Sequence, residues 1–553
     1  MISRCHPVLQ FCGCLVAWVA LAALVGGVIA DDEAEPAKTD DNAKQEPAKS
    51  LKGIEISKET TVIDGPRRDD GRIDYLAALN QRLSKGVTPE NNAAVPLLKA
   101  LPRDVIAESL RARFYEKLGV EPSGGGRYLS SERYLEQAGK TEADGGAALA
   151  EAFESQLGSA MKEPWAPMER PELGAWIAAN ERPLDAIAAG MSLPHYYMPL
   201  VGDESADYAL AAVVLPSIQS VRDVARALTA RAMLRLRLGK VEQAASDLLA
   251  CHQLARHVGE GYTLIEGLVA IAIDGVACQA DVALAASGQL SARQALDYAA
   301  RLAALPRLTD MVGKIDVGER YMFLDAVMTI AVAEPGGGAT LVEELVGDAD
   351  SPLGAAMRKL LGSSIIDWNV TLREGNRWYD RLVEVGRTTP YDKKLEAMEA
   401  FDEQLKKFAR DAGDPVSMLS RLVLGGEAPG KALGRQMSNT LVALLLPAVQ
   451  TAVIAELRGE QNFDLARLTL ILAAYRADND AYPESLSDLA PRYVKQTPRD
   501  RFRDEPLVYR RTSDGFLLYS VGPNRVDDDG GQSVESGAFG PADLVVGGRT
   551  PGG

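Results

Sequence analysis

Apolar residues recur at helical spacing through most of this chain. From residue 72 to residue 457 they return every three or four positions, and Pro- and Gly-rich turns such as 122–126 and 335–338 separate the helical stretches. The clearest pattern is a helical hairpin over residues 225–257, with a turn at Gly239-Lys240 and small and large apolar residues on both sides. This part of the sequence predicts an all-helical domain.

The hairpin resembles one tetratricopeptide unit. A stacked array of such units needs about three copies, and the sequence contains one convincing copy. We therefore expect a helical-hairpin body that is tetratricopeptide-like in part, rather than a repeat array.

Residues 262–287 are apolar on nearly all sides, which predicts a central buried helix. Glu266 and Asp274 lie within it. A buried carboxylate is either catalytic, with a raised pKa, or paired with a cation, here Arg222, Arg226 or Arg231 of the hairpin. Asp316 and Arg320 are spaced for an ion pair between residues i and i+4 of a helix.

The pattern changes near residue 458. One more helical stretch is followed by closely spaced turns and by two β-type runs, LVYRR and GFLLYSV. The predicted fold class is mainly α, with a small C-terminal α+β domain. The predicted domains are a signal peptide or anchor (1–30), a disordered acidic linker (31–71), an all-helical domain (72–457) and an α+β domain with a short antiparallel sheet (458–553).

Composition and charge narrow the classes of partner. Hydrophobic residues make up 46% of the chain but aromatic residues only 6%, so Ala, Leu and Val carry the apolar content, as in closely packed helices. The formal net charge is -17, and the sequence lacks a long Lys/Arg run that would follow a phosphate backbone. We expect protein partners rather than nucleic acid; the oligomeric state stays open.

The N-terminus predicts export. An apolar stretch from Phe11 to Ile29 follows Arg4, and small residues precede the acidic pair Asp31-Asp32. The stretch also reaches the roughly 20 residues that span a bilayer, so a retained membrane anchor is the alternative. The expected location is the periplasm or the cell envelope.

Removal of a signal peptide leaves two cysteines, Cys251 and Cys278. If their helices meet at residues 259–261, their heights differ by about 13 Å, whereas a disulfide requires Cα atoms within about 7 Å. We expect both thiols to be free.

His252 and His257 are five residues apart and do not share a helix face, which argues against a zinc site built from them with Cys251.

Several elements in residues 464–546 occur in a fixed order: Ala474-Tyr475-Arg476, then YPESL, PRD, PLVY, YSVGPN and an acidic loop. This segment of about eighty residues resembles the globular domain of the major (G-type) pseudopilins of type II secretion. The resemblance implies a calcium ion in the acidic loop, with ligands at Asp527, Asp528, Asp529 and Asp543. The alternative is an acidic, solvated turn. The rest of the chain resembles uncharacterised exported bacterial helical proteins.

The sequence offers no Gly-x-Ser-x-Gly elbow, Walker-type loop or paired CxxC motif. The first functional hypothesis is therefore a noncatalytic envelope protein that binds or scaffolds partners, with a calcium-stabilised C-terminal domain. The second is an enzyme that uses buried carboxylates, with Glu266, Asp274 and Asp316 as candidates. The third is an accessory component of a type II secretion or pilus-like system.

Overall fold

The computed structural model of the chain describes residues 51, 53–122, 124–139, 146–202, 210, 213, 215, 217–332, 366–412, 428–445, 449–531 and 543–549. The predicted signal peptide or anchor (1–30), residues 31–50 of the predicted linker and residues 532–542 beside the acidic loop lie outside the described residues. The helices are α2 (Tyr75–Leu83), α3 (Ala94–Ala100), α4 (Glu108–Leu118), α5 (Ser131–Gln137), α6 (Gly146–Ala160), α7 (Pro171–Ala179), α8 (Glu181–Gly190), α9 (Ile218–Arg237), α10 (Val241–Gly259), α11 (Leu264–Ala286), α12 (Ala292–Ala303), α13 (Met311–Lys314), α14 (Arg320–Val332), α17 (Trp368–Arg387), α18 (Tyr391–Ala412), α20 (Pro429–Leu445) and α21 (Val449–Asn479).

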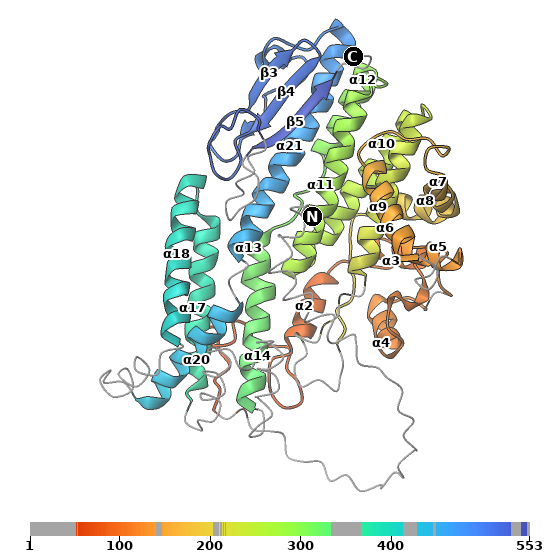
Figure 1. Ribbon diagram of the computed structural model, residues 1–553. Helices are drawn as coiled ribbons and strands as arrows, with labels where there is room; N and C mark the ends of the chain where they lie inside the picture. Colours follow the sequence, from red (N-terminus) through yellow and green to blue (C-terminus); the bar gives the residue numbers. More distant parts are fainter. Residues whose placement is uncertain are drawn as a thin grey trace.

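The fold is mostly helical, as predicted, and two long helices form its centre. The predicted buried helix is α11, which packs against α9 and α10 on one side and α21 on the other, while α12 also packs along α21 (Figure 1). α11 is long and apolar enough to cross a membrane, but 56% of its most apolar window is buried, and core helices pass the same test. Its position between packed helices accounts for its apolar composition.

Local signals set the ends of these elements. Gly239, with φ of 72°, follows α9 and allows the turn into α10 that forms the predicted hairpin. Thr263 and Glu266 form a capping box at the start of α11, in which each side chain accepts a hydrogen bond from the other residue's backbone N–H. Ser291 and Gln294 form the same motif at the start of α12.

A second helical group has its own core. α14, α17, α18 and α20 lie together (Figure 1) and bury a separate cluster of apolar residues that includes Phe323, Tyr379 and Met437. Residues 53–71 pack against this group, although their sequence predicts a disordered linker. Ile54 is buried there, Asn376 donates hydrogen bonds to the carbonyls of Glu59 and Thr60, and Arg68 pairs with Asp325.

The C-terminal strands form two antiparallel sheets. β1 (Arg499–Asp500) pairs with β2 (Glu505–Pro506), and β3 (Val508–Thr512), β4 (Gly515–Ser520) and β5 (Leu544–Arg549) form a second sheet in that order. β4 and β5 pack on α21, and β5 also contacts α11 (Figure 1). The predicted boundary between residues 457 and 458 falls inside α21, which runs unbroken from the helical body into this unit.

Candidate functional site

A fully buried polar network joins α10, α11 and α12. Its centre is His252 of α10, whose Nδ1 lies 2.5 Å from Asp274 Oδ1 and whose Nε2 lies 2.9 Å from Asp281 Oδ2, both on α11. The hydroxyl of Tyr298, from α12, donates to Asp281 Oδ1 at 2.7 Å. His252 and both carboxylates are 0% exposed. The imidazole therefore bridges two acids that water does not reach.

Arg256, one turn after His252, supplies the second cation. Its Nη1 donates to Asp274 Oδ1 and to the carbonyl of His252, and Nε donates to the carbonyl of Pro306. The guanidinium lies 4.5 Å from the ring centroid of Phe463 on α21, and the His252 ring meets the same ring edge to face. The network therefore extends from α10, α11 and α12 to α21.

The charges in this network shift each other's protonation. Burial alone lowers the pKa of His252, but the charges of Asp274 and Asp281 and their hydrogen bonds outweigh it and raise that pKa to about 9. Burial acts to raise the pKa of Asp274, but His252 and Arg256 together bring it below its ordinary value. His252 is therefore an imidazolium at neutral pH, and two cations face two carboxylates.

Searches against protein-family models, curated proteins and solved structures find no match to this chain.

The three candidate catalytic carboxylates lie in separate environments. Glu266 accepts hydrogen bonds from the Thr263 backbone N–H and hydroxyl, and lines a small pocket near Tyr196. Asp274 belongs to the His252 network. Asp316 pairs with Arg320 at 2.7 Å, which confirms the predicted i,i+4 pair.

The predicted arginine partners of Glu266 and Asp274 were wrong. Arg231 instead makes a two-pronged contact with Asp247 of α10, at 2.6 and 3.0 Å, and also bonds Asp185 of α8 at 2.9 Å. The expected partners lie on α9, whereas the cations that reach Asp274 lie on α10, the helix directly before α11. Asp281 was missed, although Asp274, Cys278 and Asp281 follow the i, i+4, i+7 spacing of one helix face.

Both cysteines are free and buried, as predicted. His252 and His257 point to different partners: Nε2 of His257 lies 3.0 Å from the carbonyl of Met191, and its ring stacks on Tyr196. Cys251, His252 and His257 are thus not gathered into one site. A different group is: within the described residues, ligand atoms of His252, Asp274 and Cys278 all lie within 4.8 Å of one another.

The acidic loop follows β4. The Asp527 carboxylate accepts hydrogen bonds from the Tyr519 hydroxyl and the Asp529 backbone N–H, and Asp528 accepts one from Asn524. Oδ2 of Asp543 accepts a hydrogen bond from the N–H of Gly530 at 2.9 Å. Asp529 instead pairs with Arg510 at 2.7 Å.

Of the four acids Asp527, Asp528, Asp529 and Asp543, Asp543 is the buried one, with 5% of its surface exposed. Its Oδ1 accepts no hydrogen bond within the part of the chain that the structure describes. Burial raises its pKa, and the negative charges of Asp528 and Asp527 add to the rise, while the N–H groups of Gly530 and Asp528 act in the opposite direction. Asp543 is therefore a carboxylate whose charge is incompletely compensated.

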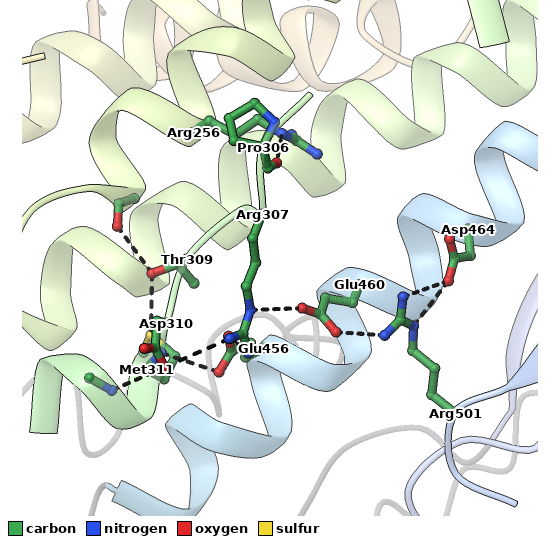
Figure 2. A network of polar contacts seen from close by, with 12 residues as sticks. Arg256, Pro306, Arg307, Thr309, Asp310, Met311, Glu456, Glu460, Asp464 and Arg501 are labelled. Carbon is green, nitrogen blue, oxygen red and sulfur yellow. Dashed lines mark hydrogen bonds and ion pairs between the residues drawn. The ribbon is translucent and has the colours of Figure 1, made fainter. Parts of the chain in front are cut away.

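A row of ion pairs connects the C-terminal unit to the helical body (Figure 2). Arg307, between α12 and α13, pairs with Glu456 at 2.6 Å and with Glu460 at 3.2 Å, and Arg501 pairs with Glu460 at 2.7 Å and Asp464 at 2.8 Å. The three acids are spaced four residues apart on α21 and share one face. Arg501 lies in the turn between β1 and β2, so both parts of the protein hold the same helix face.

Proposed function

We propose that this chain is a noncatalytic binding or scaffold protein of the cell envelope, and that calcium stabilises its C-terminal unit. Asp543 is the observation that carries the calcium part. A buried carboxylate with an unpartnered oxygen beside two further carboxylates is costly without a cation. Calcium accepts about 6–8 oxygen ligands in flexible geometry, which suits a loop of this kind.

Asp527, Asp528 and Asp543 are the proposed side-chain ligands. Asp529, the fourth acid that the resemblance implies, would first have to leave Arg510, so it is assigned a lesser role. The oxygen atoms of these acids do not form a group within 4.8 Å of one another among the described residues. Binding would therefore draw Asp527 and Asp528 toward Asp543, and calcium would order the loop as well as neutralise it.

The helical body supports the noncatalytic part of the proposal. The three carboxylates that the sequence offers as catalytic candidates each have structural partners: Glu266 belongs to a capping box, Asp274 contacts His252 and Arg256, and Asp316 pairs with Arg320. Networks of this type fix the relative positions of helices. A rigid helical body with a clamped terminal unit suits a protein that presents a surface to partners.

Calorimetric titration of Ca²⁺ into the chelator-treated full chain tests the proposal. We expect one site that is lost in Asp528→Ala and in Asp543→Asn, and retained in Asp514→Asn, which changes an exposed acid in the β3–β4 turn. Mg²⁺ in place of Ca²⁺ should bind more weakly, because it requires a tight octahedral site. A folded chain that takes up no Ca²⁺, or binds it equally well in both loop variants, would refute the calcium site.

A further inference from the structure

The His252 network contains the elements of a second, different metal site. Asp274 and Cys278 lie one turn apart on α11, with Cys278 Sγ 3.8 Å from Asp274 Oδ2, and His252 Nδ1 faces them from α10. All three side chains are buried. Nitrogen, oxygen and sulfur donors in one group suit Zn²⁺ and related ions rather than Ca²⁺ or Mg²⁺.

The far side of the imidazole already has the support that a metal-binding histidine needs. A histidine that binds a metal usually donates its other N–H to a carboxylate, which fixes the ring and its tautomer. Here Nε2 of His252 faces Asp281 at 2.9 Å, and Asp281 is held in turn by the Tyr298 hydroxyl at 2.7 Å. With Nε2 protonated, deprotonation of Nδ1 would direct its lone pair toward Asp274.

One Zn²⁺ can replace two protons here without changing the net charge of the buried site. Without metal, two cations, His252 and Arg256, face the carboxylates of Asp274 and Asp281. Binding of one Zn²⁺ would release the Nδ1 proton of His252 and the thiol proton of Cys278 to solvent, forming Zn–N, Zn–S and Zn–O bonds. Two positive charges enter and two leave, so the cluster stays neutral and the burial of unpaired charge is avoided.

Arg256 lies at the edge of this arrangement, with its Nη1 3.5 Å from His252 Nδ1, and would have to turn away from Nδ1 when a metal binds. It bonds Oδ1 of Asp274, whereas Oδ2 is the oxygen on the Cys278 side. Arg256 can therefore remain on Oδ1 while Oδ2 binds the metal. Three protein ligands leave the fourth position of a tetrahedral ion for water or another small ligand.

We propose that His252, Asp274 and Cys278 bind one Zn²⁺-type transition-metal ion, with Asp281 and Tyr298 as positioning residues. The site is independent of the calcium loop. Because it is fully enclosed, the metal enters while the chain folds rather than through an open channel.

The test uses the full chain, unfolded in denaturant with chelator, freed of both, and refolded with Co²⁺ as a spectroscopic substitute for Zn²⁺. We expect one Co²⁺ per chain, with the near-ultraviolet charge-transfer band that a cobalt–thiolate bond produces. Cys278→Ser should lose the band. Cys251→Ser is the matched control, because Cys251 is equally buried and adjacent to His252, but its thiol contacts Thr229 and backbone carbonyls; it should keep the band.

The zinc content of the protein provides one further readout. Zn²⁺ content of the chain purified without chelator should approach one per molecule, and Asp528→Ala should leave it unchanged. If Cys278→Ser does not fold, the wild-type band still decides, since only a thiolate ligand produces it. A folded wild-type chain that holds no stoichiometric Co²⁺, that holds it without the band, or that loses the band in Cys251→Ser would overturn the proposal.

Discussion

His252 and Asp281 are joined by a hydrogen bond of 2.9 Å between Nε2 and Oδ2 in which both side chains are 0% exposed. This contact connects α10 to α11, and Tyr298 extends it to α12. A polar link of this kind is stabilising only while its donors and acceptors stay matched. The stability of the central helices should therefore depend on the protonation of one imidazole.

In metal-free protein, prepared by unfolding and refolding the chain with chelator, the free energy of unfolding should fall as the pH rises from about 7 to 10. The pKa of His252 is about 9 in the folded chain and near 6.5 when unfolded, so its contribution is complete below pH 6.5 and is lost as the pH rises through 9. Each pH unit between these values is worth about 1.4 kcal/mol, which gives a total on the order of 3 kcal/mol.

Urea denaturation of wild type and His252→Gln at several pH values measures this effect. The variant should be less stable at pH 6.5 and should show a smaller decline toward pH 10. His195→Gln, which changes a partly exposed histidine, should follow the wild-type profile. Parallel profiles for wild type and His252→Gln would show that the imidazole is neutral in the folded chain.

The buried contact between Arg231 and Asp247 predicts that a single substitution lowers the stability of the protein much more than substitution of both residues. Their side chains are 1% and 2% exposed. Arg231→Met leaves Asp247 with Arg235 alone and should lower stability by about 3 kcal/mol. Addition of Asp247→Leu should recover much of that loss, because no buried charge then remains unpaired. Arg293→Met, at a side chain 91% exposed, should change chemical denaturation little; equal effects at both positions would contradict the burial argument.

The contribution of Glu456 to stability should fall as the pH rises, whereas that of most ion-paired acids increases. Burial raises its pKa to about 7, against the charge of Arg307, so its ionised form is disfavoured by folding and its contribution to stability falls as the pH rises from 4.5 through 7. Glu456→Gln should match wild type near pH 5 and be more stable by about 1–3 kcal/mol at pH 8. Gln can still accept the hydrogen bond from Met311 N–H.

Glu460→Gln is the matched control for that experiment. Glu460 lies one turn along α21, is shared by Arg307 and Arg501, and is more exposed. Its loss should lower stability by about 0.5–1 kcal/mol at both pH values. Thermal melts of the two variants at pH 5 and pH 8 separate the predictions. Destabilisation of Glu456→Gln at pH 8 would mean that Arg307 compensates the carboxylate fully.

Much of the fold followed from local pattern. The hairpin around Gly239, the apolar helix from Leu264 and the strands at LVYRR and GFLLYSV are all present, because each depends on periodicity and turn residues within a short window. Two features did not follow. Residues 53–71 are mostly polar, but their few apolar side chains pack into the second core, and contacts with Asp325 and Asn376, more than 250 residues away, also hold them. The continuity of α21 through residue 458 also depends on packing against α11 and α12.

In the candidate sites, too, local features could be predicted from the sequence and features that depend on packing could not. The i,i+4 pair of Asp316 and Arg320 is local, and the sequence predicted it correctly. The partners of Asp274 depend on how α10 and α11 face each other, which the sequence pattern does not determine. Likewise, the four acids of the C-terminal loop looked equivalent in sequence, whereas packing buries Asp543 and Arg510 engages Asp529.

Thermal unfolding of the full chain and of Asp543→Asn, each with Ca²⁺ and with chelator, tests the proposed calcium site. For wild type we expect a higher melting temperature with Ca²⁺, since an ion that binds only the folded state stabilises it. Without Ca²⁺, Asp543→Asn should melt higher than wild type, because the incompletely compensated charge is gone, and Ca²⁺ should no longer raise its melting temperature. A wild-type melting temperature that is the same with Ca²⁺ and with chelator would show that calcium does not stabilise the folded chain.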